Sequence, residues 1–102
     1  MKSFENKVTE LLNNDGSKTT YAELIKTCSD FLPKNEAKDG WTATLQKESF
    51  RVEAAVKDAK PGETINIEDN DLLLIQKFCV GFGWNTKHID LIDFDEYLQE
   101  IK

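Results

Sequence analysis

Residues 64–80, TINIEDNDLLLIQKFCV, decide the fold. In this stretch a segment of alternating polar and apolar residues is followed by an acidic turn and then by an almost continuous apolar run. The alternation of polar and apolar side chains over residues 64–67 predicts a short β-strand. The acidic and Asn side chains at 68–71 are typical of a helix N-terminus, where carboxylates are stabilised by the helix dipole. We therefore predict a helix over about residues 70–80. Since this helix is apolar nearly all round, we expect it at the centre of the core.

The N-terminal third of the sequence predicts a helical hairpin. Apolar side chains recur with a 3.6-residue period over residues 4–13 and predict a first helix. A second helix is predicted over residues 21–32, because Thr20 and Glu23 form a capping-box pattern ahead of an apolar stripe. The short connection predicts that the two helices lie antiparallel as a hairpin over residues 4–32.

Two further helices are predicted in the rest of the chain. Residues 90–101 carry an apolar stripe, and Asp90 and Asp93 occupy the positions expected of an N-cap and an N3 residue. Residues 47–60 carry an apolar face and end at a Pro-Gly pair, which stops a helix. This face consists of Phe50, Val52, Ala55, Val56 and Ala59.

The predicted fold class is mainly α: a compact bundle of four to five short helices that can include one small two-stranded β-element. Residues 41–45 fit either a strand paired with residues 64–67 or the lead-in to the following helix, and the pattern leaves both open. A length of 102 residues suits a single domain, 1–102, in which the hairpin packs on an acidic C-terminal part, 63–102. The expected core is Leu11, Leu24, Ile25, Phe31, Val52, Val56, Leu73, Ile75, Phe78, Phe94 and Leu98.

Location and redox state follow from the apolar runs and the cysteines. No apolar run approaches the roughly 20 residues that a membrane span needs, and the first residues do not resemble a signal peptide. We therefore expect a cytoplasmic protein, in a cell or in an infected host, with no membrane partner. Cys28 and Cys79 lie within apolar helical patterns, which favours free, buried thiols.

Charge is distributed unevenly along the chain. The net charge is −6; residues 1–62 carry ten acidic and ten basic side chains, whereas residues 63–102 carry nine acidic and three basic ones. Arg51 is the one arginine. Because arginine dominates phosphate recognition, and an anionic surface is repelled by acidic lipid headgroups, direct binding to nucleic acid or to a membrane is disfavoured.

No motif predicts catalysis, a metal site or a cofactor. His88 is the one histidine, and a small cysteine-dependent enzyme would have to pair it with Cys28 or Cys79. A buried apolar cysteine keeps its thiol protonated, which argues against this alternative. A calcium loop that starts at Asp69 would place Leu73 at a position that needs an oxygen ligand, so that reading fails.

Our first hypothesis is a non-enzymatic interaction protein that meets a basic protein surface, such as that of a nucleic-acid-binding protein, through acidic helical faces near the C-terminus. The alternative is a self-associating assembly protein that uses exposed rings among Tyr21, Trp41, Phe82 and Trp84. The sequence leaves the oligomeric state open. The predicted partner-binding residues are Glu68, Asp69, Asp71, Asp93, Asp95, Glu96 and Glu100.

The stretch from Arg51 to Leu98 resembles small acidic proteins encoded by tailed bacteriophages. The shared features are the Ile-Asn-Ile-Glu-Asp segment at 65–69 that leads into a Leu/Ile-rich helix, then Trp84, then Phe-Asp-Glu-Tyr-Leu at 94–98. This resemblance implies a viral accessory or host-interaction role and implies no active site.

Overall fold

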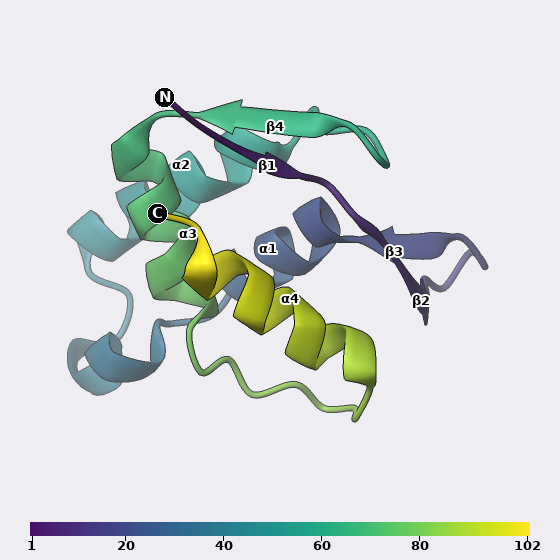
Figure 1. Cartoon of the computed structure of the whole chain (residues 1–102). Coiled ribbons are helices and arrows are strands. Elements are labelled where there is room, and N and C mark those ends of the chain that lie inside the picture. Colours follow the sequence, from purple (N-terminus) through teal and green to yellow (C-terminus); the bar gives the residue numbers. More distant parts are fainter.

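The first twelve residues form two β-strands instead of the predicted helix. The computed structural model describes the backbone of residues 1–102 and all side chains except those of residues 35–37. In it, β1 spans Lys2–Glu5 and β2 spans Val8–Leu12. They form one extended stretch that pairs first with one partner strand and then with another (Figure 1).

Two partner strands complete two separate antiparallel sheets. β1 pairs with β4, Thr64–Ile67, in a register that places Phe4 opposite Ile65. β2 pairs with β3, Lys18–Thr20. The predicted strand at residues 64–67 is thus confirmed, but its partner is β1 and not residues 41–45.

The prediction of a mainly α fold is therefore wrong, and so is the hairpin over residues 4–32. The chain is an α+β mixture, 49% helical, with four α-helices and two two-stranded sheets. The physical reason is that Phe4 and Asn6 are buried while Ser3 and Glu5 are exposed, which is the period of two of a strand. The polar Asn6 at an inward position hides this period in the sequence.

The four predicted helices that follow residue 20 are present in the predicted order, with shifted ends. The capping box of α1 is confirmed: the Thr20 hydroxyl accepts a hydrogen bond from the Glu23 amide, and the Glu23 carboxylate accepts one from the Thr20 amide at 3.1 Å. The elements are α1 (Tyr21–Ser29), the 3-10 helix η1 (Lys34–Asp39), α2 (Ala43–Val56), α3 (Asp69–Cys79) and α4 (Ile89–Glu100).

Residues 41–45 lead into α2. The Thr42 hydroxyl accepts a hydrogen bond from the Leu45 amide at 3.2 Å and so caps this helix. Val52 and Val56 face the core from α2, as predicted, whereas Phe50 is 68% exposed.

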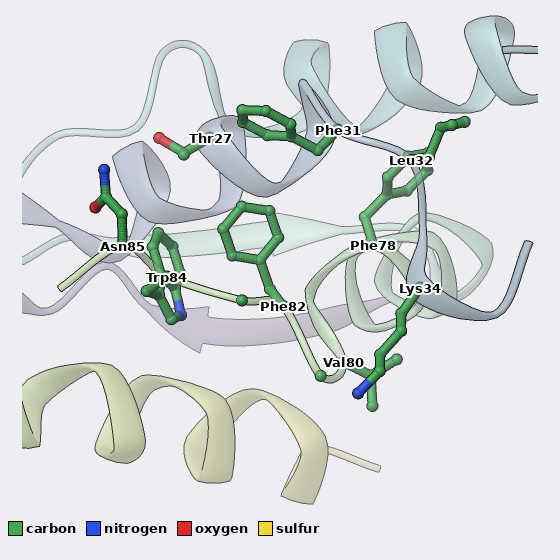
Figure 2. A pocket seen from close by; sticks show the side chains of 11 residues that line it. Thr27, Phe31, Leu32, Lys34, Phe78, Val80, Phe82, Trp84 and Asn85 are labelled. Carbon is green, nitrogen blue, oxygen red and sulfur yellow. The ribbon is translucent and has the colours of Figure 1, made fainter. Parts of the chain in front are cut away.

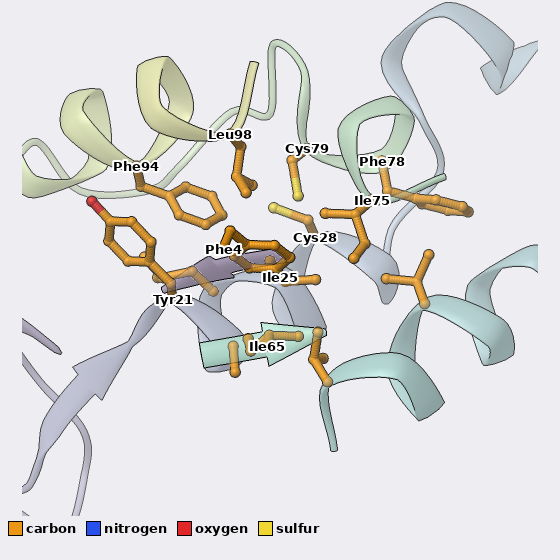
Figure 3. Packing of buried hydrophobic residues seen from close by; sticks show 14 of the residues in the cluster. Phe4, Tyr21, Ile25, Cys28, Ile65, Ile75, Phe78, Cys79, Phe94 and Leu98 are labelled. Atoms are coloured by element: carbon orange, nitrogen blue, oxygen red, sulfur yellow. The ribbon is translucent and has the colours of Figure 1, made fainter. Parts of the chain in front are cut away.

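The core lies where α3 packs against α1, α2 and α4 (Figure 3). α3 packs against three helices, as expected of a central helix, but its far side is open to solvent, since Leu73 is 63% exposed. Phe31 is also wrong as a core residue: α1 ends before it and leaves it 56% exposed. Leu11 is half-buried. The other eight predicted core residues are buried, namely Leu24, Ile25, Val52, Val56, Ile75, Phe78, Phe94 and Leu98.

Asn6 joins three parts of the chain from the corner between β1 and β2. Its side chain is fully buried; its Oδ1 accepts a hydrogen bond from the Ala22 amide at 2.7 Å, and its Nδ2 donates to the Lys60 carbonyl at 3.0 Å. Its backbone pairs with Gly62 and Glu63. The start of α1, the turn before β4 and the N-terminal strand are thereby fixed to one another.

Substitution Asn6→Ala should lower the free energy of unfolding by about 2–4 kcal/mol, because the buried Ala22 amide and the part-buried Lys60 carbonyl lose their hydrogen bonds. Urea unfolding followed by circular dichroism measures this difference. The exposed Asn70 supplies the control, and Asn70→Ala should change the free energy of unfolding by less than about 0.5 kcal/mol. Equal unfolding midpoints for the two variants would contradict this role of Asn6.

Candidate functional site

The candidate binding site is a groove between α4 and the N-terminal strands. Its volume is about 410 Å³. Asp93, Glu96 and Glu100 are exposed and lie on one side of α4, because residues three and four apart are neighbours on a helix. We call these three residues the α4 acidic row. The groove is lined by Lys7, Val8, Thr9, Tyr21, Asp90, Asp93, Glu96, Tyr97 and Glu100.

Two hydrogen bonds hold α4 beside the N-terminal strands. The Asp90 carboxylate accepts a hydrogen bond from the Glu10 amide at 2.8 Å, near the start of the helix. One helix turn from the other end, the Tyr97 hydroxyl accepts one from the Glu5 amide at 3.0 Å. The position of the α4 acidic row therefore depends on the strands that the sequence pattern did not predict.

The N-cap of α4 is His88, which corrects the assignment of Asp90 to that position. The His88 Nδ1 accepts a hydrogen bond from the Asp90 amide at 3.1 Å. Asp90 is thereby placed in the first turn, and its carboxylate is available for the Glu10 amide.

The pKa of the Tyr21 hydroxyl responds to the negative charges that line the groove. The residue is 4% exposed, and its ring packs edge-on against Phe94 with 5.1 Å between ring centroids. Burial raises the pKa of the Tyr21 hydroxyl above its ordinary value, and the nearby carboxylates of Asp93 and Asp90 raise it further. The ring of Tyr97 carries the Lys7 ammonium 4.3 Å from its centroid, a cation–π contact that sequence reasoning missed.

The seven predicted partner-binding carboxylates do not share one surface. Glu68, Asp69 and Asp71 lie at the start of α3, where two of them have cationic neighbours. Asp71 Oδ1 lies 2.8 Å from Arg51 Nη2, and Asp69 lies 3.4 Å from the Met1 nitrogen. The structure thus separates this group from the α4 acidic row.

Asp95 lies in a second groove, of about 400 Å³, that is also lined by Cys79 and His88. Cys28 and Cys79 are both buried and free, as predicted, and their sulfur atoms lie near each other (Figure 3). A hydrogen bond with Cys28, together with burial, raises the pKa of the Cys79 thiol well above its ordinary value. Since a thiolate is the reactive form, this contact opposes the cysteine–histidine chemistry considered from the sequence.

A third pocket, of about 670 Å³, was not predicted from the sequence (Figure 2). Phe31 forms one wall, from just beyond the end of α1, and Phe82 and Trp84 come from the segment after α3. Of the aromatics considered for self-association, Tyr21 is buried, and Trp41 is 38% exposed with its ring stacked on Phe78.

Within the part of the chain whose side chains are described, no group of three His, Cys, Asp or Glu residues is arranged to hold a metal ion. None of the described helices has the length and apolar character needed to cross a membrane. Comparison with known proteins finds no matching family model, no matching curated sequence and no matching solved structure.

The field of the groove is measurable through Tyr21. In a Tyr97→Phe variant, which leaves Tyr21 as the one tyrosine, a spectrophotometric titration should give a midpoint above the ordinary value of about 10. Adding Asp93→Asn should move that midpoint down, because one carboxylate charge is removed. A midpoint at or below the ordinary value in the single variant would contradict the described surroundings of Tyr21.

The same shift has a consequence for stability. Because the folded state raises the pKa of Tyr21, its contribution is fully present below the unfolded value of about 10 and is lost as the pH rises through the folded value. The free energy of unfolding should therefore fall less steeply at alkaline pH in Tyr21→Phe than in the parent chain.

Proposed function

We propose that this chain is a non-enzymatic interaction protein that binds a basic surface of a partner protein through the α4 acidic row. The observation that carries the proposal is the exposure of Asp93, Glu96 and Glu100 along one groove. Over these residues the helix rises by about 10 Å, so a partner would meet a short row of negative charge. Lysine and arginine side chains of the partner would lie opposite.

The charges of the α4 acidic row are not neutralised by any ion pair among the described side chains. Among the residues whose side chains are described, no ion pair involves Asp93, Glu96 or Glu100. Of the described residues that line the groove, Lys7 is the one cation, and its ammonium lies over the Tyr97 ring. A row of unpaired carboxylates retains its field for an incoming cation, which favours rapid encounter with a basic surface.

The acidic group at the start of α3 contributes differently. Asp71 is paired with Arg51, whereas Glu68 is exposed and has no capping hydrogen bond. We assign this group, together with Asp95, to the long-range negative field and the α4 acidic row to direct contact. The proposed partner is a nucleic-acid-binding protein, because such proteins present surfaces rich in lysine and arginine.

The proposed setting is the cytoplasm, where Cys28 and Cys79 would stay reduced. The resemblance of residues 51–98 to small acidic proteins of tailed bacteriophages adds a viral accessory role in host cytoplasm. The comparisons with known proteins add nothing to that resemblance, so the viral setting is part of the proposal.

The proposal is tested with a triple variant, Asp93→Asn, Glu96→Gln and Glu100→Gln, and with octalysine as the basic probe. Calorimetry at about 0.05 M salt should show binding to the parent chain that weakens steeply by about 0.2 M, because salt screens exposed charges. The triple variant should bind at least about tenfold more weakly, given up to about 1 kcal/mol for each lost ion pair.

The control is a second triple variant with the same change in net charge: Asp39→Asn, Asp58→Asn and Glu63→Gln, all at exposed positions. It should weaken octalysine binding by less than about threefold, because it alters only the general field. Equal losses in the two triple variants would show that net charge alone attracts the probe, and the assignment to α4 would then be wrong.

A further inference from the structure

We infer that the pocket between the end of α1 and residues 80–85 binds a small apolar carboxylic acid, a molecule with a hydrocarbon body and one carboxylate. We call it the aromatic pocket. Its volume, about 670 Å³, lies within the range of about 300–1,000 Å³ typical of small-molecule sites. This inference is independent of the α4 acidic row, since none of the three residues of that row lines the aromatic pocket.

The apolar body of such a ligand would be held by three aromatic side chains. The Phe82 ring centroid lies 5.6 Å from that of Phe31 and 4.5 Å from that of Trp84. Trp84 also packs against Phe94 in the core, at 6.2 Å, so the wall of the pocket is anchored. Phe31 is 56% exposed although it is a large apolar ring, and an occupant would remove this surface from water.

The charge of the pocket predicts an anion. Among the lining residues whose side chains the structure describes, Lys34 is the one that carries a charge, and none of them is a carboxylate. The chain as a whole carries a net charge of −6, so the positive charge of Lys34 at the pocket is opposite in sign to the net charge of the molecule. Figure 2 shows Lys34 at one end of the pocket and the polar side chains of Thr27 and Asn85 at the other. A carboxylate beside Lys34 would leave the hydrocarbon body against the rings.

Gly81 leaves room for the lysine. A Cβ atom placed on Gly81 would lie 3.0 Å from Lys34 Cδ and 3.6 Å from Lys34 Nζ, so the lysine stem lies directly against this glycine. Gly81 also has a φ of +65°, a conformation that side chains disfavour. Gly81 thus leaves the space that the Lys34 side chain occupies at the pocket.

The test compares three probes with the same ring system: 2-naphthoate, 2-naphthylmethanol and 2-naphthylmethylammonium. Titrations followed by NMR shifts of the Phe82 and Trp84 amides should show that the carboxylate binds most tightly and the ammonium least. Lys34→Gln should weaken naphthoate binding by about threefold and leave the neutral alcohol unchanged, because an exposed ion pair contributes modestly. Lys47→Gln, at an exposed position on α2, should change neither.

The rings are tested by a matched pair of exposed phenylalanines. Phe31→Ala should weaken binding of all three probes by about tenfold, because one wall of the pocket is lost. Phe50→Ala removes a ring of similar exposure on α2, outside the pocket, and should leave binding unchanged. No binding of any probe at millimolar concentration, equal affinity for the three probes, or equal effects of the two alanine substitutions would each overturn the inference.

Discussion

The buried amide of Asn6 is the constraint on which the arrangement of this chain depends. A fully buried amide must find hydrogen-bond partners, and here they are the Ala22 amide at the start of α1 and the Lys60 carbonyl before β4. These groups lie 16 and 54 residues away in the sequence. One short side chain therefore fixes where the N-terminal strand crosses the helical part of the molecule.

The position of the acidic groove follows from that crossing. On one side of Asn6 the Glu5 amide donates to Tyr97, and on the other the Glu10 amide donates to Asp90. Both acceptors belong to α4, so the N-terminal strand holds this helix at two points about two turns apart. The side of α4 that carries the acidic row is thus set by strand geometry as well as by the core packing of Phe94 and Leu98.

Sequence signals predicted correctly those helix ends that are determined by residues close together in the sequence. The capping box at Thr20 and the acidic start of α3 depend on residues a few positions apart, and both are found near the predicted places. The helix predicted over residues 4–13 is wrong because two of the inward positions of this extended stretch, Asn6 and Thr9, are polar, and because the strand that pairs with β1 lies about sixty residues away. Phe31 and Leu73 were placed in the core because periodicity does not tell where a helix ends or which side of it is covered.

The candidate site was predictable in the same way. Asp93, Glu96 and Glu100 share one side of α4 because of helical spacing alone, and the structure brings them together in one groove. The ion pair between Asp71 and Arg51 joins α3 to α2. No pattern within either helix sequence predicts it. The aromatic pocket was missed because it requires the end of α1 and the segment after α3 to meet. The sequence indicates the pocket only through its aromatic residues Phe31, Phe82 and Trp84.

Amide hydrogen exchange of Ala22, measured by NMR, tests the central claim most directly. If Asn6 Oδ1 accepts the hydrogen bond of this amide in a dry interior, Ala22 should exchange only through global unfolding, as slowly as the central amides of α3. Exchange of Ala22 as fast as that of the exposed amides around Gly16 would contradict the account.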